Sequence, residues 1–142
     1  MGRRLAREKA MQVVFQIDVG KIQPDIAIEN IMQETELASD DFEFFKKLVD
    51  GVLANLYFLD EKIKKYTIDW DIERLANVDR NILRLAVYEM YFLPTEIPQN
   101  VSINEAIELV KKFGNPESSK YINGILDRIK KEAVSQMGDK NV

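Results

Sequence analysis

Hydrogen-bonding and charged side chains gather at one predicted helix start, in the segment FGNPESSKYINGILDRI at residues 113–129. Its glycine and its Asn-Pro pair indicate that one helix ends and another begins here. The first turn of the new helix carries Ser118, Ser119, Lys120 and Tyr121. Free backbone N–H groups, hydroxyls, a cation and an aromatic ring are the parts of a site for single-stranded nucleic acid. The alternative is that Ser118 only caps the helix and Tyr121 only packs.

Gly124 falls inside the same predicted helix. Glycine in a helix interior costs about 1 kcal/mol relative to alanine. A close backbone approach, either by another helix or by a ligand, would explain it.

The basic N-terminus is a second candidate site. Arg3, Arg4 and Arg7 fall in the first turns of the first predicted helix, where the helix dipole slightly disfavours cations. Arg3 and Arg7 share one face because they are four residues apart, and Gln12 lies near its edge. Guanidinium groups bind phosphate through paired hydrogen bonds, so the pattern indicates a phosphate-binding patch for RNA. The alternative is that these arginines only increase solubility.

The residue types present argue against catalysis. The chain contains no cysteine and no histidine, which excludes disulfides, thiol catalysis, most zinc sites and the commonest general base. The acidic pairs Glu105 with Glu108 and Glu73 with Asp79 are typical of solvated helix faces. We find no phosphate-cradling glycine loop and no motif of a nucleophile with a base. We therefore expect a protein that is not an enzyme and that uses no cofactor and no metal.

Apolar residues recur at helical spacing and no segment alternates like a strand, which predicts an all-α fold. We expect a compact bundle of about seven helices, among them helices at about 3–19, 24–36, from 39 onward, 79–92, 102–113 and 117–135. The pattern breaks near residue 67. We therefore expect a single domain, residues 1–142, with an N-terminal helical half over about 1–66 and a C-terminal half over about 67–142.

Some helix ends carry recognisable signals. Ser39 is expected to cap the third helix, whose apolar line runs on to Ile63. Ser102 and Glu105 form an S-x-x-E capping box. Helix ends are expected at two glycines, Gly20 and Gly114. The helix at 79–92 is apolar on several faces, which predicts that other helices surround it.

The charge is unevenly distributed. The net charge is -4, yet residues 1–12 carry four cations against one acid. A basic tip on an acidic body suggests one anionic partner and a second, basic one. No apolar run approaches the ~18 residues that a membrane span needs, and no apolar segment of a signal peptide follows the basic start. We expect a cytoplasmic protein.

Three segments together resemble the NusB family of bacterial transcription antitermination factors: RRLAREKAMQVVFQ, VDRNILRLAVYEM and VSINEAIELVKKFGNPESSKYINGILDRI. The resemblance covers nearly the whole chain. It implies an all-helical fold of two packed halves and an adaptor between RNA and protein rather than an enzyme. In that family the partners are single-stranded boxA RNA, the small-subunit ribosomal protein NusE, and RNA polymerase with other Nus factors.

The resemblance also assigns roles by position. RNA contacts fall on Arg3, Arg4, Arg7, Glu117, Ser118, Lys120, Tyr121 and Asn123, and contacts with NusE on Phe15, Glu73 and Asp79. Three positions depart from the family pattern: Phe15 lacks the hydroxyl of a tyrosine, Asp79 is shorter than a glutamate, and Glu117 is longer than an aspartate. These differences affect contact geometry more than the roles.

Two other interpretations stay open. The first is a helical module in ribosomal RNA processing, since a NusB-like domain also occurs fused to ribosomal RNA methyltransferases. The lack of a glycine-rich cofactor loop argues against an enzyme of that type. The second is a protein-binding scaffold whose basic patches are incidental. Salt separates it from an RNA-binding protein, because phosphate contacts weaken steeply as salt rises.

Overall fold

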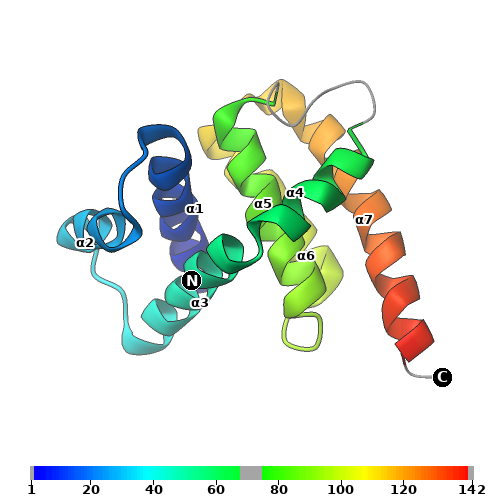
Figure 1. The fold of residues 1–142 in the computed structure, drawn as a ribbon, viewed down its shortest axis with the longest axis horizontal. Coiled ribbons are helices and arrows are strands. Elements are labelled where there is room, and N and C mark those ends of the chain that lie inside the picture. The colour runs from blue at the N-terminus through cyan, green and yellow to red at the C-terminus, as the bar shows by residue number, and fades with distance from the viewer. Residues whose placement is uncertain (1, 68–74, 141–142) are drawn as a thin grey trace. The chain divides into compact units, whose positions relative to one another are not determined.

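The computed structural model describes residues 2–67 and 75–140, with side chains as far as residue 135. Seven α-helices and one 3-10 turn make up this described part, which has no strand and confirms the all-α prediction (Figure 1). None of the helices described is long and apolar enough to cross a membrane. The chain divides into two compact units, Met1–Asn55 and Leu56–Val142. The division thus comes earlier than the break in periodicity near residue 67 suggested.

The first unit consists of α1 (Gly2–Gly20), α2 (Pro24–Glu34) and α3 (Ser39–Ala54). α1 packs against both α2 and α3. The apolar stripes of α1 and α3 are buried, namely Ala6, Ala10, Val13, Val14, Phe45, Leu48, Val49 and Val52. α1 ends at Gly20 as predicted, although the residue with positive φ is Lys21, at 55°.

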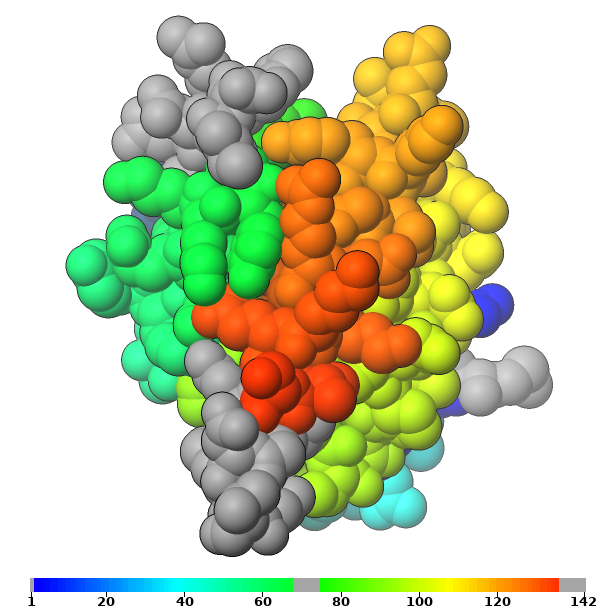
Figure 2. All heavy atoms as spheres, turned by 90° about the vertical axis from the view of Figure 1, so that its right-hand side faces the viewer, coloured from blue at the N-terminus to red at the C-terminus, as the bar shows by residue number. Residues whose placement is uncertain are grey.

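The second unit contains α4 (Leu56–Lys65), α5 (Asn77–Phe92), α6 (Gln99–Phe113), the 3-10 turn η2 (Pro116–Ser118) and α7 (Ser119–Lys140). α5 packs against α4, α6 and α7, and every residue from 81 to 90 is buried. Within this unit, other helices therefore surround α5 as its apolar faces predicted. α7 packs against α4 and α6, and it lies between them on the face shown in Figure 2.

α3 and α4 are separate helices, although we predicted one continuous apolar line as far as Ile63. Asn55 ends α3 by binding its backbone. The side-chain Nδ2 of Asn55 donates to the carbonyl of Gly51 at 2.8 Å, and its backbone N–H donates to the same carbonyl at 3.1 Å. Asparagine competes with the helical pattern in this way. The apolar spacing continues across the break, which is why the pattern did not reveal it.

Two predicted N-caps are wrong. Ser39 is already the first residue of α3, and Ala38 holds the N-cap position without a side-chain hydrogen bond. Ser102 lies inside α6, whose N-cap is Pro98. The Ser102 hydroxyl instead donates to Oε1 of Glu89 in α5 at 2.9 Å. Glu89 is 2% exposed, so Ser102 satisfies a buried polar group, a role that only the tertiary structure reveals.

One carboxylate links α4 to α7. Glu132 of α7 accepts hydrogen bonds from Lys62 at 2.8 Å and Lys65 at 3.2 Å, and from the Tyr66 hydroxyl at 2.9 Å. Burial raises the pKa of Glu132, but these hydrogen bonds outweigh burial and lower the pKa to about 2. The carboxylate therefore stays charged through most of the acidic range and holds the two helices together.

Candidate nucleic-acid interface

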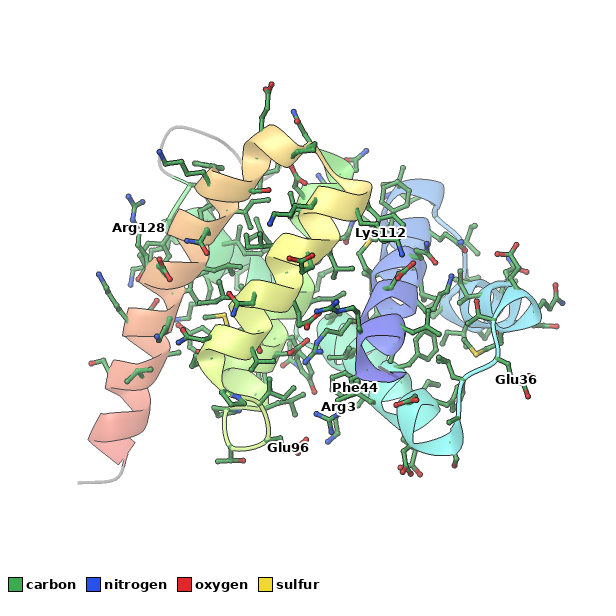
Figure 3. The ribbon with its side chains drawn as sticks, turned by 180° about the vertical axis from the view of Figure 1, so that it is seen from behind. Arg3, Glu36, Phe44, Glu96, Lys112 and Arg128 are labelled. Atoms are coloured by element: carbon green, nitrogen blue, oxygen red, sulfur yellow. The ribbon has the colours of Figure 1, made fainter. Side chains whose placement is uncertain are left out.

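The N-terminal arginines stack on a phenylalanine. Arg3 and Arg7 lie one turn apart on α1, and their guanidinium carbons lie 4.4 and 5.2 Å from the ring centre of Phe44 in α3 (Figure 3). Contacts between a cation and an aromatic face hold the guanidinium groups in place. Arg7 is only 6% exposed, whereas Arg3 and Arg4 are exposed. Within the predicted patch, Arg3 and Arg4 therefore present their charge to solvent, and Arg7 lies beneath the surface.

Two further predicted residues lie on α1. Gln12 is half-buried, and its Oε1 accepts a hydrogen bond from Lys9 Nζ at 3.2 Å. Phe15 is half-buried as well. The part of Phe15 that reaches solvent is apolar, so any contact with a partner protein here would rest on packing.

Asn115 organises the junction between α6 and α7. Its Oδ1 accepts from the backbone N–H of Glu117 at 3.0 Å, and its carbonyl accepts from that of Ser118 at 2.8 Å. The N–H of Ser119 bonds to the carbonyl of Pro116. The prediction of free backbone N–H groups is therefore wrong for these three residues. These three N–H groups are therefore not free to bind an anion.

The sequence did contain a signal for Asn115, which we treated only as a break. Asparagine is a favoured N-cap residue, and proline is favoured directly after it. The N-cap is thus Asn115, and Ser118 forms a hydrogen bond elsewhere, with Asp79.

A pocket of about 360 Å³ opens beside this turn, within the second unit. Its lining consists of Leu75, Asp79, Asn115, Glu117, Ser118, Tyr121 and Ile122. Ser118 forms a hydrogen bond with the carboxylate of Asp79, which is 3% exposed. Burial raises the pKa of Asp79, and the bond to Ser118 acts in the opposite direction. The second oxygen, Asp79 Oδ1, has no hydrogen-bond partner among the described residues.

Gly114 is glycine because Asp79 lies against it. It follows the last residue of α6, as predicted, but its φ is -99°, which any residue adopts. A Cβ here would collide with Asp79 Oδ1 and come within 3.2 Å of the carbonyl oxygen of Val110. The glycine therefore makes room for the buried carboxylate, a contact that no sequence pattern indicates.

The side chains after the turn face solvent. Lys120 and Asn123 are exposed, and Tyr121 is 39% exposed while it also lines the pocket. The Nδ2 of Asn123 lies 3.5 Å from Oδ2 of Asp127. Of the predicted residues of this junction, Glu117, Ser118 and Tyr121 line the pocket, whereas Lys120 and Asn123 are exposed but do not belong to its lining. A partly exposed aromatic ring is the kind of group on which a base can stack.

Packing against another helix does not account for the glycine inside α7. A Cβ at Gly124 would have no neighbour within 4 Å, so close approach by another helix does not explain this glycine. Glu73 lies outside the described residues. Asp79, which the resemblance assigns to the same partner contact, is buried beside the predicted RNA-binding residues. No group of three or more His, Cys, Asp or Glu suited to a metal occurs in the described ranges.

Comparison with known sequences supports the resemblance. The model of the NusB family matches residues 4–131. The transcription antitermination protein NusB of Bacillus licheniformis is 53% identical over 132 residues, which cover 93% of this chain and 98% of the relative. That of Bacillus subtilis is 50% identical over 132 residues, 93% of this chain and 97% of the relative. The predicted RNA-binding residues of the N-terminus and of the junction between α6 and α7, apart from Arg3, fall inside the matched range of the family model.

Comparison with solved structures agrees. NusB of T. maritima superposes with a TM-score of 0.84 at 39% identity, covering 92% of this chain and 91% of the other. A chain in a crystal structure of antitermination factors NusB and NusE in complex with double-stranded RNA gives the same TM-score of 0.84 at 31% identity, covering 92% and 97%. Fold and sequence therefore agree over nearly the whole length, and the chain belongs to the NusB family.

Proposed function

We propose that the protein is a transcription antitermination factor that binds boxA RNA together with NusE. On this proposal it helps RNA polymerase, with other Nus factors, to read through terminators, notably in ribosomal RNA operons. The observation that carries the proposal is the 53% identity to a transcription antitermination protein over 93% of the chain. A solved relative bound to NusE and RNA supports the choice of partners. The protein acts in the cytoplasm by binding and without catalysis, and its two units serve as one RNA-binding domain.

The proposed RNA site has two parts. In the first unit, Arg3 and Arg4 bind phosphates, and Phe44 holds the Arg3 guanidinium from below. Arg7, buried over the same ring, adds positive potential beneath the surface. In the second unit, phosphate binding falls to Lys120, and base contacts fall to Glu117, Ser118, Tyr121 and Asn123. Single-stranded RNA is recognised by cations that bind its phosphates and by polar groups and aromatic rings that contact its bases. The proposed site contains both kinds of group.

The proposed contacts with NusE are Phe15, Glu73 and Asp79. An acidic chain suits a basic ribosomal partner, because complementary charge speeds association and disfavours wrong partners. Asp79 is buried and lines the pocket, so the pocket is the route by which a partner group would reach it. A hydrogen-bond donor entering there would satisfy the free oxygen of the carboxylate.

The test is fluorescence anisotropy of a labelled boxA-like RNA, with and without NusE, beside a scrambled RNA. Lys120→Glu removes a phosphate contact and introduces repulsion, so affinity for RNA should fall on the order of tenfold while the NusE complex persists. Lys64→Glu makes the same charge change at an exposed site on α4 and serves as the matched control. Equal affinity of wild type and Lys120→Glu for boxA-like RNA would refute the site.

Salt provides the second criterion. Phosphate contacts predict that the logarithm of the affinity falls linearly with the logarithm of the salt concentration. A protein-binding scaffold with incidental basic residues would bind neither RNA, with or without NusE. Weak and equal binding to boxA-like and scrambled RNA would therefore reject sequence-specific antitermination.

A further inference from the structure

None of the residues that the structure describes explains why position 124 is a glycine. It lies in the interior of α7, and no described glycine has a positive φ. Apart from its two chain neighbours and the backbone of α7 itself, no described atom lies within 4 Å of the position that its Cβ would occupy. Alanine would fit there and would favour the helix. The remaining explanation is that the absence of a side chain lets a ligand approach the helix backbone closely.

The face of α7 that carries Gly124 is basic. Lys120 precedes it by one turn, Arg128 follows by one turn, and Lys131 follows by two. All three cations are exposed, and none forms an ion pair with another described residue. The Arg128 side chain extends away from the helix in Figure 3. The opposite face of α7 is the buried one, formed by Ile122, Ile125, Leu126 and Ile129.

We propose that this face of α7, formed by Lys120, Gly124, Arg128 and Lys131, continues the RNA-binding surface, and that the phosphate backbone of single-stranded RNA crosses the helix at Gly124. The inference rests on the proposed function. Lys120 and Arg128 lie about 12 Å apart along the helix axis and Lys131 about 5 Å beyond, a length that spans more than one phosphate. Cations on both sides of the glycine bind the strand while the glycine admits it.

The choice of RNA follows from charge and continuity. A polyanion complements three exposed cations, and the face begins at Lys120, in the same turn as the Tyr121 ring that we assign to a base. Asp127 borders the face, and Asn123 lies within hydrogen-bonding distance of its carboxylate at 3.5 Å. A side chain at position 124 would stand between the cations and hold a strand away from the helix.

The test compares Gly124→Ala, Gly124→Leu and the double change Arg128→Ala with Lys131→Ala. The probe is a labelled single-stranded RNA of about 20 nucleotides that contains a boxA-like element, with and without NusE. Gly124→Ala should raise the thermal midpoint by about 2–5 °C yet weaken RNA binding roughly threefold. Gly124→Leu should weaken binding about tenfold or more. A variant that is more stable and binds less RNA cannot owe its defect to misfolding.

Salt dependence provides an independent readout. For single strands each lost phosphate contact reduces the magnitude of the negative slope of log affinity against log salt by roughly 0.7, so the double change should reduce that magnitude by about 1.4. Lys64→Ala, an exposed lysine of α4, is the matched control and should leave the slope near that of wild type.

The outcomes separate the two proposals. If wild type binds RNA and Gly124→Leu binds it equally well, the inference about α7 is overturned and the proposed function stands. If wild type binds no RNA even with NusE, both are overturned. If the α7 variants weaken the NusE complex and leave RNA affinity unchanged, the face binds protein and the assignment to RNA is wrong.

Discussion

Replacing Glu132 by glutamine tests how the second unit is held together. Glutamine keeps the size of the side chain and one acceptor oxygen. It removes the negative charge that faces Lys62 and Lys65, and it replaces one of the two oxygens that accept from these lysines and from Tyr66 by an NH2 group. The Glu132 side chain is 14% exposed, so solvent screens these contacts little. The difference between a pKa of 4.5 and one of about 2 corresponds to about 3 kcal/mol. We expect Glu132→Gln to lower the free energy of unfolding by up to about that amount at pH 7.

The same carboxylate gives this stability a defined pH dependence. Its pKa is lower in the folded than in the unfolded protein, so its contribution is complete above the unfolded pKa of 4.5 and is lost as the pH falls towards 2. Wild type should therefore lose stability across this window. Glu132→Gln should lose less, so that the two unfolding free energies converge near pH 2.

Urea unfolding followed by circular dichroism between pH 7 and pH 2.5 measures both effects. Glu108→Gln is the matched control, because Glu108 lies 3.8 Å from Lys111 with both side chains more than half exposed. Such exposed pairs contribute about 0–1 kcal/mol. If Glu132→Gln destabilised no more than Glu108→Gln, or if its pH dependence matched that of wild type, the cluster would not hold α4 to α7 as we argue.

Two further predictions concern the candidate RNA site. Gly114→Ala should lower the free energy of unfolding by about 1–3 kcal/mol, because its Cβ would collide with Asp79. Urea unfolding measures this, with Gly124→Ala as the control because it introduces the same methyl group into open space. Equal effects at both glycines would contradict the prediction. Phe44→Leu should weaken RNA binding about threefold, because it removes the ring beneath Arg3 and Arg7 while keeping an apolar side chain. Anisotropy titrations measure this, and an unchanged affinity would show that the arginines do not need the ring.

Helix content was predictable because it depends on periodic burial. The stripes of α1 and α5 follow the helical repeat, and most of their apolar residues are buried where the pattern placed them. The exposure of Lys120, Tyr121 and Asn123 was predictable for a related reason, because these residues follow a helix stop and the turn of Pro116–Ser118.

What the sequence left out depends on partners distant along the chain. Ser102 matched a capping box, but Glu89, thirteen positions away, determines what its hydroxyl does. Arg7 matched a phosphate contact, yet Phe44 of another helix lies under its guanidinium and the side chain is buried. Gly114 matched a helix stop, whereas Asp79 determines its identity. A one-dimensional pattern gives the type of each group, and the tertiary structure decides which group it meets.

The charge of the chain bears on why RNA binding would need a partner. The protein is acidic overall, with a net charge of -4, so a polyanion meets net repulsion from the chain as a whole. The exposed cations that we assign to phosphates are few: Arg3, Arg4, Lys120, Arg128 and Lys131. Single-stranded RNA gains affinity with each neutralised phosphate, so a basic partner bound beside the strand adds contacts that this chain lacks. On this argument NusE should steepen the salt dependence of RNA binding as well as strengthen it, whereas a partner acting only by reshaping the chain would leave that slope unchanged.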